Sequence, residues 1–338
     1  MEYFLKCFKK PFALKNLFFI ICFICTSFII EAQNTSIISQ TQEPVSYATI
    51  SFGNGNGLFA DDDGTFYFTK KLYKDIDSLF ISAIGYYDLK LATKNLQSTI
   101  IMESKVSALD EVFISKPRGK FKTKKIKPTV HEDYFKCWLP TIESEIAVFF
   151  PNTSPEIKRI SSVQIPIKVE AKDWDKRKRK TANKRPFSTL FKVNFYENNN
   201  GFPGDVLTYD KVVFIANEKS KKVFELNVRD HDIYIPKNGV FVSLQILGYT
   251  DKNGKLLPNK KYQEIKTKRG IVKVSTTFRP LLPFTDKVLE KRTFIKRVFL
   301  DGGKWVLFDK ESVEKSNLLK VGLNNYGMGL KLDAFKEN

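Results

Sequence analysis

The chain has 338 residues, of which 42% are hydrophobic, and carries a formal net charge of +19. That length and apolar content allow two domains, each with a substantial core. The 30 phenylalanines, against 3 methionines, suit half-buried strands and indicate sandwich core rather than a ligand-binding aromatic stack.

Residues 1–32 have the properties of a secretory signal peptide. Four lysines precede a 14-residue, almost wholly apolar run from Leu17 to Ile30. This run is shorter than the ~20 residues that a membrane-spanning helix needs. Cleavage is expected after Ala32, which leaves residues 33–42 as an N-terminal segment. An uncleaved anchor is the alternative, because the site lacks a second small residue.

Between residues 43 and 114, short β-rich runs alternate with turn residues. Residues 45–52 predict a first strand, and Asn-Gly-Asn-Gly at 54–57 predicts a tight turn. Asp63 and Gly64 form a second turn signal, and residues 79–83 predict a further strand. Gly85 is expected at a bulge or tight bend. This spacing is typical of an all-β sandwich or barrel.

Four motifs in this stretch occur in a characteristic order. They are Pro-Val-x-x-Ala at 44–48, Asp-x-x-Gly-x-Phe at 61–66, Ser-Ala-x-Gly-Tyr at 82–86 and Leu-Asp-Glu-Val at 109–112. In this order the motifs resemble the carboxypeptidase regulatory-like domain, a small transthyretin-like β-sandwich common in Bacteroidota envelope proteins. The resemblance implies an accessory module without catalytic residues, placed in the periplasm or at the outer-membrane surface.

The charge of the chain is unevenly distributed. Residues 33–114 are net −4, with 6 lysines and 10 acidic residues; residues 1–32 are net +2, so residues 115–338 carry +21. Residues 115–130 contain seven Lys or Arg residues and no acidic residue, with prolines near both ends. Because dense like charges extend a chain, we expect a flexible basic linker here, with polyanion binding as the alternative.

Residues 131–338 predict a second, larger β-domain. Strand-like runs recur across it and are separated by Asn-Gly and Asp-Gly-Gly turns at 200–201, 238–239, 253–254 and 301–303. The order fits a β-sandwich or jelly roll of roughly eight to ten strands. Part of this region, from Phe195 to Phe241, resembles a sandwich module that accompanies the first domain in envelope proteins and has no assigned role.

A second basic run lies in a predicted loop between two strands of this domain. Five consecutive cations form its centre and are our candidate anion- or partner-binding residues: Lys176, Arg177, Lys178, Arg179 and Lys180. A solvated loop without a ligand is the alternative.

The sequence predicts no catalytic, cofactor or metal site. His131 and His231 are the two histidines and form no zinc-binding pair. Cys137, the only cysteine beyond the signal segment, lies beside a tryptophan and a leucine and is expected to be buried and inert, with a reactive thiol as the alternative. The Asp61–Gly64 stretch does not meet the calcium-loop pattern and is expected to be a turn.

These features predict an exported, non-enzymatic, two-domain β-protein that binds an envelope protein or an anionic glycan through loops and exposed sheet faces. A hydrolase whose site forms only in the folded second domain is one alternative, and a pocket joining His231 to carboxylates would favour it. A non-specific polyanion or nucleic-acid binder is the other, because the isoelectric point is near 9.5. Export and the lack of a nucleic-acid motif argue against it.

Overall fold

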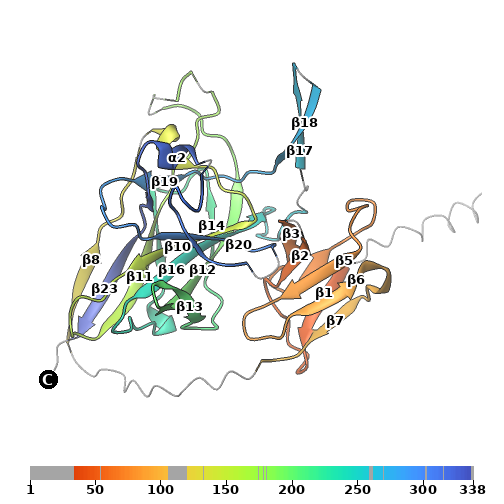
Figure 1. The fold of residues 1–338 in the computed structure, drawn as a ribbon, viewed down its shortest axis with the longest axis horizontal. Helices are drawn as coiled ribbons and strands as arrows, with labels where there is room; N and C mark the ends of the chain where they lie inside the picture. The colour runs from red at the N-terminus through yellow and green to blue at the C-terminus, as the bar shows by residue number, and fades with distance from the viewer. Residues whose placement is uncertain are drawn as a thin grey trace, which may run out of the picture.

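The computed structural model describes residues 34–53, 55–105, 120–131, 133–173, 175–177, 179, 181–258, 262–268, 270–300, 303–314 and 316–335. In these ranges the protein is all-β, as the sequence predicts, and forms two sandwiches side by side (Figure 1). None of the helices described there is long and apolar enough to cross a membrane. The signal-like segment and the Leu-Asp-Glu-Val motif lie outside the described residues.

The first sandwich is built from seven short strands in two sheets. One sheet has the order β4 (Thr65–Tyr67), β1 (Asn34–Ser39) and β7 (Thr99–Met102), with β1 antiparallel to β4 and parallel to β7. The other has the order β3 (Asn56–Phe59), β2 (Thr49–Gly53), β5 (Ser78–Ser82) and β6 (Leu89–Ala92), followed by the short 3-10 helix η1 (Thr93–Asn95). Ile37, Ile50 and Leu79 are fully buried between the sheets.

Two expectations for this sandwich need correction. Its fold begins at β1, upstream of the expected start at residue 43, because β1 is the central strand of its sheet. The predicted strand at 45–52 begins only at Thr49, since Tyr47 has a φ of 56°, which interrupts extended backbone. The predicted turn and bend are confirmed by the positive φ values of Gly64 (73°) and Gly85 (86°).

The second sandwich packs two larger sheets. The four-stranded sheet has the order β15 (Val223–Asn227), β11 (Lys158–Pro166), β23 (Gly329–Phe335) and β8 (Phe121–Ile126). The seven-stranded sheet has the order β13 (Phe202–Val206), β12 (Ser188–Asn199), β16 (Val240–Tyr249), β10 (Ser144–Phe150), β20 (Thr293–Arg297) and β21 (Val306–Leu307), with β14 (Val213–Asn217) also on β12.

Smaller elements close the ends of this sandwich. A three-stranded sheet joins β22 (Asn325–Tyr326), β19 (Leu282–Thr285) and β9 (Cys137–Trp138). The hairpin of β17 (Tyr262–Thr267) and β18 (Gly270–Ser275) pairs only with itself in the described residues and projects from the body in Figure 1. The helical elements of this region are η2 (Tyr134–Lys136), η3 (Arg229–His231) and α2 (Asn317–Lys320).

Large apolar side chains fill the space between the two larger sheets. Phe191, Val193 and Phe195 alternate along β12 toward this core, where they meet Leu330 and Leu332 of β23. Each is at most 4% exposed. Burying a side chain of this size contributes about 1.5–3 kcal/mol to folding. The phenylalanine-rich composition therefore serves the sandwich core, as predicted.

The basic tract predicted as a linker is largely part of the second sandwich. Residues 121–126 form β8 and pair with β23 from Phe121↔Phe335 to Ile126↔Leu330. Beyond β8, Thr129 donates a backbone hydrogen bond to the Gly327 carbonyl at 2.8 Å. Residues 115–119 lie outside the described chain. The expectation of a flexible tether over 115–130 is thus wrong for its second half, because β23 offers that half an edge to pair with.

Candidate functional site

An acidic turn of the first sandwich contacts basic residues of the second. Lys211 Nζ lies 2.7 Å from Asp62 Oδ1, and Lys255 Nζ lies 3.5 Å from Asp63 Oδ2. The backbone N–H of Leu256 donates to Asp61 Oδ2 at 3.2 Å. Burial opposes ionisation of Asp63, but hydrogen bonds from Thr65 and the charge of Lys255 lower its pKa. The predicted turn therefore forms part of the contact between the two sandwiches.

Apolar packing lies behind these ion pairs. Tyr47 and Phe59 of the first sandwich form a cluster with Leu190, Leu247 and Phe299 of the second. The rings of Phe59 and Phe299 have their centroids 5.1 Å apart. The Ser51 hydroxyl donates to the Phe299 carbonyl at 2.6 Å. The contact buries side chains from both domains, so it fixes their mutual orientation.

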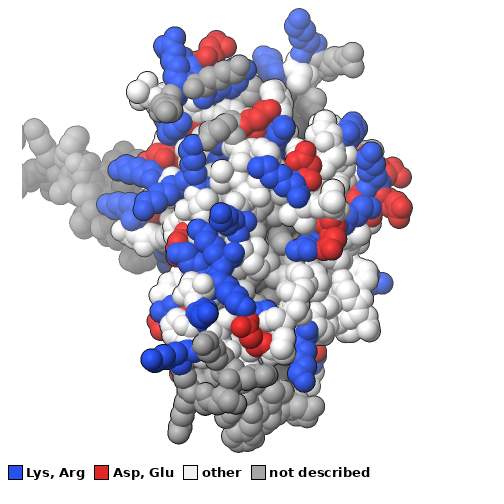
Figure 2. Space-filling view, turned by 90° about the vertical axis from the view of Figure 1, so that its left-hand side faces the viewer, with Lys and Arg blue, Asp and Glu red and all other residues white. Residues whose placement is uncertain are grey.

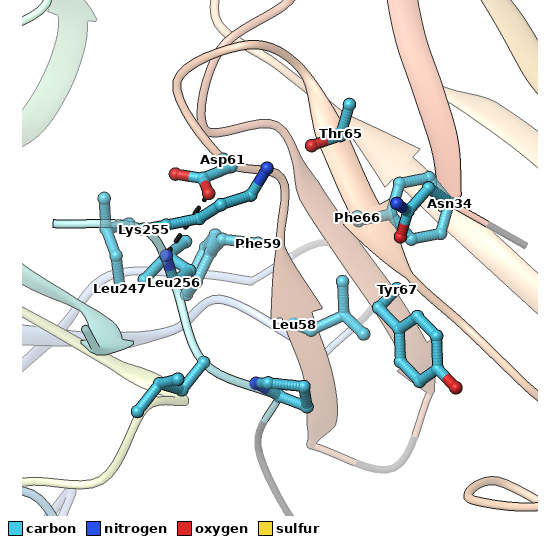
Figure 3. A pocket seen from close by; sticks show the side chains of 12 residues that line it. Asn34, Leu58, Phe59, Asp61, Thr65, Phe66, Tyr67, Leu247, Lys255 and Leu256 are labelled. Atoms are coloured by element: carbon cyan, nitrogen blue, oxygen red, sulfur yellow. Dashed lines mark hydrogen bonds between the residues drawn. The ribbon is translucent and has the colours of Figure 1, made fainter. Parts of the chain in front are cut away.

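A small cavity of about 80 Å³ opens at this junction (Figure 3). Its wall is mostly apolar, with one carboxylate and one lysine, and consists of Asn34, Leu58, Phe59, Asp61, Thr65, Phe66, Tyr67, Leu247, Lys255, Leu256, Leu257 and Pro258. Ligand pockets usually enclose roughly 300–1,000 Å³. The cavity has room for a few water molecules rather than for a metabolite.

The outer face of the seven-stranded sheet contains a buried carboxylate. Glu145 on β10 is 1% exposed, and its Oε1 accepts hydrogen bonds from Asn194 (2.9 Å), Tyr196 (2.8 Å) and Ser243 (2.5 Å). Its Oε2 lies 3.0 Å from Lys296 Nζ. Burial opposes the charge, but Lys296 and the three donors lower the pKa of Glu145. A carboxylate held ionised by this many partners is structural rather than a proton donor.

Two lysines flank this single carboxylate. Cross-strand pairing places Lys192, Gln245, Glu145 and Lys296 in one row across four strands. Desolvation lowers the pKa of Lys192, although the nearby Glu145 acts in the opposite direction. The Lys296 ammonium lies 4.7 Å from the centre of the Trp305 ring. The charges on this face are thus paired or shielded by neighbouring side chains.

The outer face of the four-stranded sheet also contains a buried carboxylate paired with cations. Figure 2, seen from the side on which β8 and β23 lie in Figure 1, shows many Lys and Arg side chains and fewer acidic ones. Asp333, fully buried, lies 3.1 Å from both Arg159 Nη2 and Arg229 Nε. Lys331 pairs with Glu225 at 2.5 Å. These pairs neutralise the middle of the sheet.

The edge of the same sheet retains unneutralised charge. We call the lysines on and beside β8 the lysine edge: Lys120, Lys122, Lys124, Lys125 and Lys127. All five are exposed. Lys124 forms an ion pair with Glu156, and no ion pair is found for the other four within the described part of the chain. The charge density of this tract predicted a linker, with polyanion binding as the alternative, and these lysines were not among the predicted site residues.

The described members of the candidate set, Lys176, Arg177 and Arg179, fall on a loop between β11 and β12. Lys176 is exposed and lies 3.1 Å from Asp173, Arg177 is half-buried, and Arg179 is exposed. Lys178 and Lys180 lie outside the described residues. The loop is closed at its base by the Lys172 to Asn183 backbone hydrogen bond of 2.8 Å. Its role as a binding site stays a prediction.

The residues considered for catalysis do not form a recognised constellation. His231 Nδ1 lies 2.8 Å from Asp210 Oδ2, but the Asp210 side chain is 56% exposed. No Ser, Thr or Cys side chain hydrogen-bonds to His231 in the described ranges. Cys137 is half-buried, with its thiol 3.3 Å from the Asp133 carbonyl. Within the described residues, no group of three His, Cys, Asp or Glu side chains is arranged to hold a metal ion.

Comparison with known proteins gives distant likenesses only. No family model matches the chain, and no curated protein matches it. Among solved structures, the clostridial cysteine protease Cwp84 after propeptide cleavage aligns at 10% identity with a TM-score of 0.33, covering 82% of this chain and 51% of that one. The cysteine protease and lectin-like domains of Cwp84, a surface-layer-associated protein of Clostridium difficile, align at 8% identity with a TM-score of 0.32, covering 86% of this chain and 59% of that one. This chain thus spans a little over half the length of either.

Proposed function

We propose that this protein is an exported, non-catalytic binding or accessory protein of the cell envelope, and that its partner is anionic. The first sandwich is the carboxypeptidase regulatory-like module that its motifs resemble, and it orients the second. The second sandwich carries the binding surface. The observation that carries this proposal is the lysine edge, where exposed cations are held on or beside an ordered strand and Lys124 is the one member with an acidic partner among the described residues.

Order distinguishes the lysine edge from an ordinary basic tail. Charges held on a strand lose little conformational entropy when they bind, whereas a flexible tail must be ordered at the same moment. Backbone pairing with β23 fixes the spacing of the lysines. A preorganised row of cations suits a partner with regularly spaced negative charge.

Export is supported by the sequence of residues 1–32 and by the family resemblance. The segment combines lysines with an apolar run too short for a spanning helix. The mature chain would then meet anionic polymers and proteins in the periplasm or at the outer-membrane surface. Intact-mass measurement of protein from the native envelope tests this. The mass of a chain that begins near Gln33 supports export, and the mass of the full-length chain contradicts cleavage.

The binding proposal is tested with alginate, a linear polyuronate, compared with neutral dextran and with unrelated duplex DNA at physiological salt. Replacing Lys122 and Lys125 with Gln should weaken alginate binding roughly threefold to tenfold and reduce its salt dependence. The matched control removes two exposed charges from the first sandwich, Lys71→Gln with Lys74→Gln, and should bind as the wild type does.

The predicted loop is tested in the same assay. Neutralising all five cations of 176–180 shows whether this loop adds to the lysine edge or is only a solvated face. If the wild-type protein binds alginate no better than dextran, and binds acidic proteins no better than neutral ones, the proposed function is wrong. Equal binding of DNA and alginate would instead indicate a non-specific polyanion binder.

A further inference from the structure

Strand β8 leaves one edge of the four-stranded sheet open. It is the last strand in the order β15-β11-β23-β8, and its one described strand neighbour is β23. All six of its residues are exposed. Figure 1 shows no strand beyond β8 on the outer side of the sheet. An edge of this kind presents unpaired backbone N–H and C=O groups that another strand can pair with.

The pairing pattern identifies which residues face this open edge. Phe335 of β23 donates its backbone N–H to Ile157 at 2.9 Å, toward the β11 side. In an antiparallel sheet the backbone groups of successive residues alternate in direction. The backbone N–H and C=O groups of Ala334 therefore point toward β8, and those of its partner Lys122 point back toward β23. By the same alternation, the residues of β8 whose backbone N–H and C=O groups point to the open edge are Phe121, Thr123 and Lys125.

Cations lie on both faces of this edge strand. Side chains of Phe121, Thr123 and Lys125 share the face of Asp333, whereas Lys122 and Lys124 share the face of the core residue Leu332. Both sets extend beyond the sandwich core and are exposed. An added strand would therefore meet lysines above and below its own plane.

The segment that contains β8 also lies very close to the segment that contains β23. A side-chain carbon at Gly329 would lie 2.4 Å from the Ile126 carbonyl oxygen, and one at Gly327 would lie 2.3 Å from that of Thr129. The two segments can lie this close only because Gly327 and Gly329 have no side-chain carbon. The segment that contains β8 is thus packed closely on β23 and is preformed for pairing.

We propose that β8 accepts an extended acidic polypeptide segment as an additional strand, so that main-chain hydrogen bonds provide affinity and the lysine edge selects for acidic side chains. The inference rests on the proposed function and names its partner as a protein. Lysines on an edge strand disfavour pairing with basic strands and with copies of the same edge. Cross-strand pairs of opposite charge are stabilising, so the same lysines favour an acidic strand.

The first experiment uses the full chain and a synthetic peptide of alternating glutamate and valine. Amide hydrogen exchange is followed at Thr123 and Lys125, whose N–H groups face the open edge. Saturating peptide should slow exchange at these two amides by at least roughly tenfold, because they acquire hydrogen-bond partners. A peptide of alternating lysine and valine should leave them unchanged. Binding of the acidic peptide without protection of these amides contradicts strand addition.

A charge-neutral variant separates backbone pairing from electrostatics. Thr123→Pro removes an outward N–H and leaves the inward-facing backbone groups of β8 in place, since proline is tolerated on strand edges that face solvent. It should reduce affinity for the acidic peptide about tenfold, and Thr123→Val, which keeps the N–H, should not. Dextran sulfate, a flexible polyanion, should bind Thr123→Pro as well as it binds the wild type.

The outcomes distinguish this inference from the function on which it rests. Unchanged peptide affinity in Thr123→Pro overturns strand addition, even if alginate binding persists. Loss of peptide and dextran sulfate binding together in Lys122→Gln with Lys125→Gln, but not in Thr123→Pro, also overturns it and leaves a purely electrostatic surface. If Thr123→Pro does not fold, the exchange measurement on the wild type still decides the question.

Discussion

Two parts of the larger sandwich treat charge in opposite ways: the outer face of the seven-stranded sheet and the edge strand of the four-stranded sheet. On the seven-stranded sheet, Glu145 is buried among three hydrogen-bond donors and Lys296, and the first sandwich packs at the end marked by Leu190 and Leu247. On the edge strand of the four-stranded sheet, the lysines of β8 are exposed, and among the described residues Lys124 alone of them forms an ion pair. Lysines therefore stabilise the fold on the seven-stranded sheet and remain available to a partner on the edge strand.

The largest loss of unfolding free energy is expected from Glu145→Gln, on the face where charges are paired. The change removes the charge that pairs with Lys296 and favours the charged form of Lys192, and breaking such a buried pair destabilises a protein by about 3–5 kcal/mol. Urea unfolding of the full chain measures the difference. Ser243→Ala, which removes one hydrogen-bond donor, should cost only about 1 kcal/mol. If Glu145→Gln lowers the unfolding free energy by less than Ser243→Ala does, the charges on this face are also solvated.

The same carboxylate predicts a pH dependence. Because its pKa is lower in the folded protein than in the unfolded chain, Glu145 contributes stability above its unfolded pKa of about 4.3. That contribution is lost as the pH falls through the folded pKa. The difference in unfolding free energy between the wild type and Glu145→Gln should be constant near neutral pH and shrink in acid. A difference that grows in acid contradicts the lowered pKa.

An intermediate effect is expected when β8 is displaced from its sheet. In Gly329→Val the new side chain overlaps the Ile126 carbonyl oxygen, and such overpacking costs about 1–3 kcal/mol. Trypsin should then cleave the lysine edge faster, since strand pairing no longer protects it. Thr123→Val is the control and should change neither quantity. Unaltered cleavage of Gly329→Val would mean that the tract is accessible regardless of β8 pairing.

The smallest effect is expected at the ion pairs between the sandwiches. Reversing the charge of Lys211 to Glu places it against Asp62, but both side chains are more than half exposed. The domain contact should weaken by no more than about 1 kcal/mol, and Asp62→Lys added to it should restore the contact. Calorimetric unfolding, in which the two sandwiches separate into distinct transitions when uncoupled, provides the measurement. No rescue by the double variant would assign the contact to apolar packing alone.

Local sequence patterns were sufficient for much of the fold. The alternation of apolar and polar side chains along residues 190–196 is by itself enough to predict β12, because side chains of a strand point alternately to the core and to the other face. The Asp-Gly at 63–64 and the glycine at 85 predicted turns, because positive φ favours glycine. The all-β class follows from these short-range preferences. None of them identified β1 as the start of the first sandwich, since its pairing with β7 joins residues far apart in the chain.

Residue composition alone gave the wrong structure for a basic segment whose strand partner lies far away in the sequence. Residues 120–127 and 172–185 are similarly basic, yet the first tract is a strand and the second is a loop. The alternation of Phe121, Thr123 and Lys125 was compatible with a strand, but the charge density favoured a tether. The free edge of β23, more than 200 residues later, decided the outcome.

The sequence by itself determined the β class, the turns and the excess of positive charge in the second half of the chain. The tertiary structure alone decided which charges are neutralised. It brings Glu145 beside Lys296 and Asp333 between two arginines, but gives the lysines of β8 a single ion pair within the described part of the chain. The physical reason is that strand preferences depend on neighbouring residues, whereas electrostatic pairing and burial depend on groups that only folding brings together.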